Sequence, residues 1–192
     1  MLDYLISMHK KHCNDITKKL VDTSIVSSPI IEDMAQDLGF ELRLTLTGFK
    51  FIGEQVNMLV EENRESDFLF GFEESYGYCS GTHVRDKDAL NAIALFISLA
   101  RTLKADGISV SEQLDKIYKK YGYYVIKISS YSYPGAKGAA RMQEIMDGLQ
   151  NQPLTEIAGL KVEGFKDYNK GVEMTIVNPS CAPQTLPASN VL

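Results

Sequence analysis

Residues 20–46 read LVDTSIVSSPIIEDMAQDLGFELRLTL, and they predict how the chain begins to fold. The first seven are mostly apolar or β-branched, which is typical of a buried strand. Ser28 and Pro29 supply a helix N-cap and first helical position, and Gly39 is the residue type that closes a helix. Residues 40–46 alternate apolar and polar side chains, as a strand with one wet face does. This stretch therefore predicts a strand, a helix and a second strand.

The same alternation of strands and helices continues outside this stretch. Helices are expected near the N-terminus and over residues 49–62, 86–107 and 134–149, a further helix begins at the capping box of residues 109–112, and strands are expected over 68–72, 123–131 and 160–165. Such alternation is typical of an α/β fold. We predict an αβα sandwich with a small sheet of about four strands and a truncated C-terminal extension. The pattern alone does not distinguish a parallel from a mixed sheet, and we predict a mixed one.

Composition and charge exclude several classes of protein. The chain has 192 residues, of which 44% are apolar and 23% charged, so it has enough apolar residues for a buried core. Its 20 Lys and Arg against 25 Asp and Glu leave no basic excess for nucleic acid. No apolar run approaches the roughly 18 residues of a membrane span. The three widely spaced cysteines, Cys13, Cys79 and Cys181, favour neither a disulfide framework nor a zinc site, so we expect a cytoplasmic protein.

The composition changes after Asn151-Gln152-Pro153, where a turn follows the last long helix. We therefore expect one compact domain over residues 1–152 and a separate segment over residues 153–192. The second segment contains one strand-like run and then a stretch rich in Pro, Ser and Asn. It is expected to be the start of another domain.

Two polar loops follow predicted strands, at residues 47–50 and 72–78, and the second continues through residues 81–88. Ligands of open α/β sheets bind beyond strand ends. Glu73 and Ser75 provide a carboxylate and a hydroxyl two residues apart, which suits the hydroxyl groups of a sugar, and Gly77 lets the backbone approach closely. The alternative is that the acidic pair Glu73 and Glu74 only caps or solvates a loop.

Three motifs in fixed order carry a family resemblance. They are TGFKFIG at residues 47–53, GFEESYGY at 71–78 and VRDKDA at 84–89. With these motifs the chain resembles the third domain of the α-D-phosphohexomutase family, and bacterial phosphoglucomutase and phosphomannomutase-like members most. The resemblance covers nearly the whole chain.

The resemblance implies roles for individual residues. It implies that sugar is bound by Glu73, Ser75, Thr47, Gly48 and Arg85, although Arg85 is also open to a structural role. Lys87 matches a lysine directed at the reacting phosphate, where an ammonium stabilises charge on the transferring group. The resemblance implies no metal ligand in this chain.

The resemblance also implies a larger enzyme around this chain. Phosphohexomutases have four domains, and they interconvert hexose 1-phosphate and hexose 6-phosphate through a bisphosphate. The phosphoserine, Mg²⁺ and phosphate-binding motifs of domains I, II and IV are not found in this sequence. Residues 1–152 would be domain III, and residues 153–192 the linker and first strand of a truncated domain IV. We expect Mg²⁺ in the parent enzyme, none bound here, and no activity from this chain alone.

Two further functions stay open at the level of the sequence. Some relatives with a similar loop act on pentose phosphates, so the first alternative is that the parent enzyme is a phosphopentomutase. A free-standing module that binds sugar phosphates would contain the same loop without any catalysis. The expected partners under each interpretation are sugar phosphates, and neither nucleic acid nor a membrane is expected.

Overall fold

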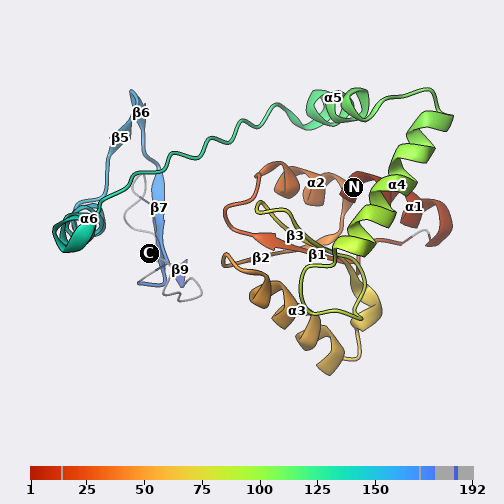
Figure 1. The fold of residues 1–192 in the computed structure, drawn as a ribbon, viewed down its shortest axis with the longest axis horizontal. Coiled ribbons are helices and arrows are strands. Elements are labelled where there is room, and N and C mark those ends of the chain that lie inside the picture. The colour runs from red at the N-terminus through yellow and green to blue at the C-terminus, as the bar shows by residue number, and fades with distance from the viewer. Residues whose placement is uncertain (14, 169, 176–183, 186–192) are drawn as a thin grey trace. The chain divides into compact units, whose positions relative to one another are not determined.

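The computed structural model describes residues 1–13, 15–168, 170–175 and 184–185 (Figure 1). The chain forms two compact units, Met1–Ile126 and Lys127–Leu192. The helices of the first unit are α1 (Leu2–Cys13), α2 (Ile30–Leu38), α3 (Phe49–Glu61), α4 (Ala89–Ala105) and α5 (Val110–Tyr121), with a short 3₁₀ turn at Glu65–Asp67. Its strands are β1 (Leu20–Ser24), β2 (Glu41–Thr45), β3 (Phe68–Glu73) and β4 (Gly77–Cys79).

The first unit is built on a four-stranded mixed sheet with the order β2-β1-β3-β4. Strands β2, β1 and β3 run parallel, and β4 runs antiparallel to β3. This confirms the predicted α/β fold and the predicted mixed sheet. Strand β4 was not predicted, because its three residues directly follow a tight loop and show no alternating pattern of their own.

Helices cover both faces of the sheet (Figure 1). On one face, Val21 of β1 packs in a buried cluster with Ile6 of α1 and Met34 of α2. On the other face, Leu20 packs with residues of α3, among them Ile52. Because neighbouring residues of a strand point to opposite faces, β1 contributes to both clusters. All five of its residues are buried.

The helix-end signals at Gly39 and at residues 109–112 are confirmed, whereas the predicted N-cap at Ser28 is wrong, because α2 begins at Ile30 with Pro29 at the N-cap position and no side-chain cap there. Gly39 closes α2 in the left-handed conformation, with a φ of 84°. The Ser109 hydroxyl accepts from the Glu112 backbone N–H while the Glu112 carboxylate accepts from the Ser109 backbone N–H, which is a complete capping box at the start of α5. No helix in the described part of the chain is long and apolar enough to cross a membrane.

The predicted strand over residues 123–131 is wrong, since residues 122–134 have no regular secondary structure. A strand exists only where a neighbour accepts its backbone hydrogen bonds, and this segment has no such partner in the described residues. Its apolar side chains are left in solvent, and Val125 is 90% exposed. Near the start of the segment, the Tyr124 hydroxyl donates a hydrogen bond to the Asp33 carboxylate of α2.

The second unit contains α6 (Gly135–Asn151), a hairpin of β5 (Glu156–Ile157) and β6 (Leu160–Lys161), and an antiparallel sheet of β7 (Gly164–Asp167), β8 (Val172–Thr175) and β9 (Gln184–Thr185). The predicted helix over 134–149 is confirmed. The single strand predicted over 160–165 is wrong, because these residues end one hairpin and begin the next sheet. The division into family domains after residue 152 stays a prediction.

A buried carboxyl group lies in the central strand. Asp22 of β1 is 0% exposed, and its Oδ1 accepts from the Thr45 hydroxyl at 3.2 Å. No hydrogen-bond partner of Oδ2 is present among the described residues. Burial raises the pKa of Asp22 to about 7, against the opposing effects of the Thr45 hydrogen bond and the Arg43 guanidinium. Asp22 is therefore neutral over most of the acidic range.

This burial predicts how stability depends on pH. Between about pH 4 and pH 7 folded Asp22 keeps a proton that the unfolded chain loses, so the free energy of unfolding falls as pH rises. Asp22→Asn imitates the neutral carboxyl and should remove this fall, with a gain of roughly 1 to 3 kcal/mol at about pH 8. Urea unfolding at several pH values measures the effect. The control is Asp115→Asn, at an exposed aspartate. An Asp22→Asn profile parallel to that of the original chain would contradict the assignment.

Candidate functional site

The candidate site lies where two parallel strands end at the same edge of the sheet. Strand β2 is followed by Thr47 and Gly48, which lead into α3, and β3 is followed by the loop of residues 74–76. Gly48 has a φ of 121°, a conformation that strongly favours glycine. Parallel pairing through β1 brings these two loops to one edge, the usual ligand-binding edge of such sheets.

Glu73, the last residue of β3, is the centre of the site. It is 5% exposed. Its Oε1 atom accepts a hydrogen bond from the Ser75 hydroxyl at 2.8 Å and lies 2.9 Å from the Lys87 Nζ atom. Its Oε2 atom is also buried and has no hydrogen-bond partner within the described residues. The predicted residues Glu73, Ser75 and Lys87 are thus brought together.

The charge state of Glu73 results from opposing effects. Burial by itself would raise the pKa of this carboxyl group. The Lys87 ammonium and the Ser75 hydroxyl outweigh burial and hold the pKa below its ordinary value, and the backbone N–H of Gly48 adds to their effect. Glu73 is therefore a carboxylate at neutral pH, although it is almost completely enclosed.

The Lys87 side chain contacts two groups of the protein and is partly exposed to solvent. Its ammonium lies 2.9 Å from the Glu73 carboxylate and 4.8 Å from the ring centroid of Phe49, the first residue of α3. The side chain is still 44% exposed, so a cation faces solvent beside a buried anion. An ammonium in this position can contact an anionic group that approaches from the solvent.

Gly77 makes this arrangement possible. A Cβ atom at this position would lie 2.9 Å from carbon atoms of Glu73, Lys87 and Phe49 alike. Real Cβ atoms do not approach carbon so closely, so any side chain here would displace all three groups. Gly77 is part of the motif at residues 71–78. The sequence did not predict that the Gly77 backbone lies close to Lys87 and Phe49.

Glu74 binds the end of β1 rather than the cluster around Glu73. Its Oε2 atom accepts from the Ser24 hydroxyl at 2.6 Å. Ser24 and Thr23 each contact the Ser27 hydroxyl, at 3.0 and 2.8 Å. Glu74 therefore joins the loop of residues 74–76 to the end of β1.

The structure does not join the other two predicted residues to this cluster by a hydrogen bond. Thr47 is exposed and lies next to Gly48 in the chain. Arg85 donates to the Asn57 side chain of α3 at 2.6 Å and to the carbonyl oxygen of Thr82. These bonds tie the loop before α4 to α3. A substrate contact of Thr47 or Arg85 stays a prediction.

Two residues of the site were missed by sequence reasoning. Phe49 reads as an apolar residue at the start of an amphipathic helix, and Ser24 as one residue inside the strand expected over 20–26. Nothing in their local pattern separates them from ordinary core residues, because their role depends on Lys87 and Glu74, which are far away in the sequence. Across the described ranges, no group of three His, Cys, Asp or Glu side chains is placed to hold a metal ion.

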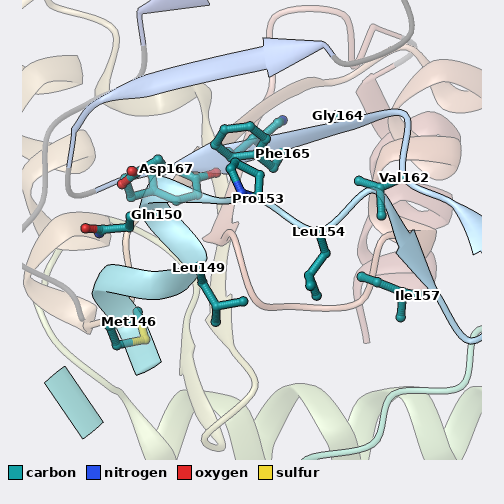
Figure 2. Close-up of a pocket in the computed structure, with 12 residues that line it drawn as sticks. Met146, Leu149, Gln150, Pro153, Leu154, Ile157, Val162, Gly164, Phe165 and Asp167 are labelled. Atoms are coloured by element: carbon teal, nitrogen blue, oxygen red, sulfur yellow. The ribbon is translucent and has the colours of Figure 1, made fainter. Parts of the chain in front are cut away.

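A separate hollow of about 380 Å³ lies within the second unit (Figure 2). It is lined by residues of α6 and of the segment from Pro153 to Tyr168, and most of its lining is apolar, with Leu149, Leu154 and Phe165 among the residues drawn. It contains none of the residues that the sequence motifs indicated. We therefore assign the candidate site to the first unit.

Comparison with known proteins matches the same part of the chain. The family model for phosphoglucomutase/phosphomannomutase, alpha/beta/alpha domain III, matches residues 2–121. A phosphoglucomutase of Staphylococcus epidermidis strain RP62A is 32% identical over 188 residues, which are 98% of this chain and 34% of the relative. A phosphoglucomutase of Staphylococcus aureus strain MSSA476 is 31% identical over the same shares. The chain thus spans about a third of the length of these curated relatives.

A solved structure supports the fold. The open form of the exocytosis-sensitive phosphoprotein pp63/parafusin from Paramecium, described as a phosphoglucomutase, aligns with a TM-score of 0.57 and 20% sequence identity. The alignment covers 93% of this chain and 29% of that one. At this level of identity the likeness concerns the fold alone.

The crowding at Gly77 leads to a prediction. Gly77→Ala should lower the free energy of unfolding by roughly 1 to 3 kcal/mol, because the added methyl group overpacks the site. It should also raise the pKa of Glu73, since Lys87 must move from its position at 2.9 Å. Urea unfolding and carboxyl ¹³C NMR titration measure the two effects. Gly148→Ala is the control, because a Cβ there meets nothing within 4 Å. Equal behaviour of the two variants would contradict the prediction.

Proposed function

Because this chain belongs to the phosphoglucomutase/phosphomannomutase family through its alpha/beta/alpha domain III, we propose that it is the sugar-recognition domain of a larger phosphohexomutase. That enzyme would interconvert hexose 1-phosphate and hexose 6-phosphate through a bisphosphate. The observation that carries the proposal is the convergence of the Glu73 carboxylate, the Ser75 hydroxyl and the Lys87 ammonium at the ligand-binding edge of the sheet.

The chemistry of the three groups suits a hexose phosphate. A sugar hydroxyl both donates and accepts, and the Glu73 carboxylate accepts while the Ser75 hydroxyl does either. Glu73 is ionised at neutral pH, so its hydrogen bonds to hydroxyls are charge-assisted and strong. A site that accepts a sugar in two orientations must bind hydroxyls that both orientations present. Short donor and acceptor side chains such as these suit that requirement.

Lys87 would contact the phosphate. Its ammonium is partly exposed beside the carboxylate, so a phosphate oxygen would bind on its open side while a sugar hydroxyl reaches Glu73. In the reaction, a fixed ammonium stabilises the charge that develops on a transferring phosphoryl group. We propose contacts to the same substrate for Thr47, Gly48 and Arg85, at the rim of the site.

The rest of the enzyme would be supplied by other domains. The chain spans about a third of its curated relatives, which supports a longer parent protein with domains I, II and IV. Mg²⁺ in such an enzyme supplies a Lewis acid for phosphoryl transfer. The residues described here do not form a site for it, and no step of this proposal depends on the metal. We propose that the parent enzyme works in the cytoplasm.

Hexose phosphates are favoured over pentose phosphates by the names of the relatives, which are phosphoglucomutases. An independent sugar-phosphate module would have the same geometry. The presence or absence of phosphoserine and metal motifs in the complete reading frame decides between an enzyme and a module.

Binding of sugar to this chain tests the proposal. Glucose 1-phosphate should shift the NMR signals of Gly48, residues 73–77 and Lys87. Glu73→Ala should weaken this binding by about 10- to 150-fold, because it removes hydrogen bonds to a charged group worth roughly 1.5 to 3 kcal/mol. Glu74→Ala is the matched control, because Glu74 is the adjacent loop residue and binds Ser24 instead. Equal weakening by both variants, or shifts confined to other residues, would remove Glu73 from the site.

The isolated chain should have no mutase activity. Phosphoryl transfer in this family needs a phosphoserine and Mg²⁺, and neither motif is present in the sequence. A coupled assay with glucose 1-phosphate and its bisphosphate activator should give the same rate as buffer. Turnover above buffer that is lost in Lys87→Met would show that this part of the chain catalyses the reaction by itself.

A further inference from the structure

We infer that Phe49 and Gly77 are positioning residues, which confine the Lys87 ammonium to one place on the Glu73 carboxylate, between an aromatic face and a strand backbone. The inference rests on the proposed function only for its consequence, which is that a hexose phosphate meets a cation already in place. The confinement itself is a property of the chain without any ligand.

The Phe49 ring is a fixed surface. The side chain is 4% exposed and packs in the buried cluster between α3 and the sheet, with Val56 and Phe68 among its neighbours. A ring held in this way cannot follow a moving lysine. The Lys87 ammonium, 4.8 Å from the ring centroid, is attracted by the negative potential over the ring face.

The backbone of Gly77 is a second fixed surface beside Lys87. The place that a Cβ atom would occupy is only 2.9 Å from the Lys87 Cε atom and from the Phe49 Cδ2 atom. The aliphatic part of Lys87 therefore passes close to the backbone of β4. A lysine in an open loop samples many rotamers, whereas here the ring, the backbone and the carboxylate restrict the positions of the ammonium.

A second lysine, Lys50 in the motif that contains Phe49, shows what these contacts add. The Lys50 ammonium lies 4.8 Å from the ring centroid of Phe51, the same distance as in the Lys87 pair. Lys50 is exposed, and within the described residues it forms no ion pair. The ring alone therefore does not make a site, and the combination with Glu73 and Gly77 distinguishes Lys87.

A cation that is already in place has a chemical consequence. A preorganised charge stabilises an anion without spending free energy on reordering the side chain when the anion binds. Phe49 would therefore affect substrate binding without touching the substrate. The simpler alternative is that Phe49 only fills the core and that Lys87 reaches Glu73 regardless.

The pKa of Glu73 reports where Lys87 is, and it is measured on the 192-residue chain without ligand. The groups that face this carboxylate are Lys87, Ser75 and the Gly48 backbone N–H, and Asp86 lies 3.9 Å from the Lys87 ammonium. Lys87→Met should raise the pKa of Glu73 by the full contribution of the ammonium. Phe49→Leu should raise it by a substantial part of that shift. Phe51→Leu should leave it unchanged.

Ring fluorination separates positioning from core packing. Incorporation of 4-fluoro- and 3,4,5-trifluorophenylalanine at position 49 keeps the shape of the ring and weakens its attraction for a cation. We expect the pKa of Glu73 to rise with the number of fluorine atoms. This series also decides the question if Phe49→Leu fails to fold. An unchanged Glu73 titration in the fluorinated chains would overturn the role of Phe49, and so would an unchanged titration in Lys87→Met.

The same samples separate this inference from the proposed function. Glucose 1-phosphate is added after each titration, and its binding is followed by NMR. If the Glu73 titration responds to the substitutions while glucose 1-phosphate does not bind, the positioning role is supported and the proposed function fails. If glucose 1-phosphate binds equally to the original chain and to its Phe49 variants, binds more weakly to Lys87→Met, and the Glu73 titration does not respond to the Phe49 variants, the positioning role fails and the proposed function is supported.

Discussion

The parallel pairing of β1 with both β2 and β3 is the constraint on which the other features depend. Ser24 is paired with Thr45 of β2, and Thr23 is paired with Phe72 of β3. This register places the ends of β2 and β3 at the same edge of the sheet. The Thr23 hydroxyl adds a bond to the Phe72 carbonyl oxygen at 2.7 Å, so the pairing is reinforced where the loops begin. A slip of one residue would exchange the side chains of β1 between the two covered faces of the sheet and shift the loop of Gly48 relative to Glu73.

At this edge, Glu73 stays ionised because its contacts with Lys87 and Ser75 outweigh the cost of burying a carboxylate. Enclosing a carboxylate costs free energy unless a cation and hydrogen-bond donors face it. Lys87 and Ser75 provide both, and because Lys87 is partly exposed, little desolvation of the ammonium is needed. The site is thus built from an anion that the sheet buries and a cation that solvent still reaches. Such a pair offers acceptors and a positive charge to one ligand, as the hydroxyls and phosphate of a sugar phosphate require.

The two units have different relations to this site. The first unit contains both buried clusters and every residue of the candidate site, and the family match of residues 2–121 falls within it. The second unit has an apolar hollow and short strands, and no residue that the motifs indicated. Since the chain spans about a third of its curated relatives, the chemistry of a complete phosphohexomutase is proposed to come from parts outside these residues.

Local signals in the sequence were enough for the α/β alternation, the end of α2 at Gly39, the capping box of α5 and the motif that contains Glu73, because each depends on neighbours within a few residues. Tertiary structure alone decided the rest. Residues 123–131 have strand-like composition but no partner for their backbone among the residues that the structure describes, and β4 forms because β3 is beside it. The contact of Phe49 with Lys87 joins residues far apart in the chain across Gly77, and no local pattern encodes a distance of that kind.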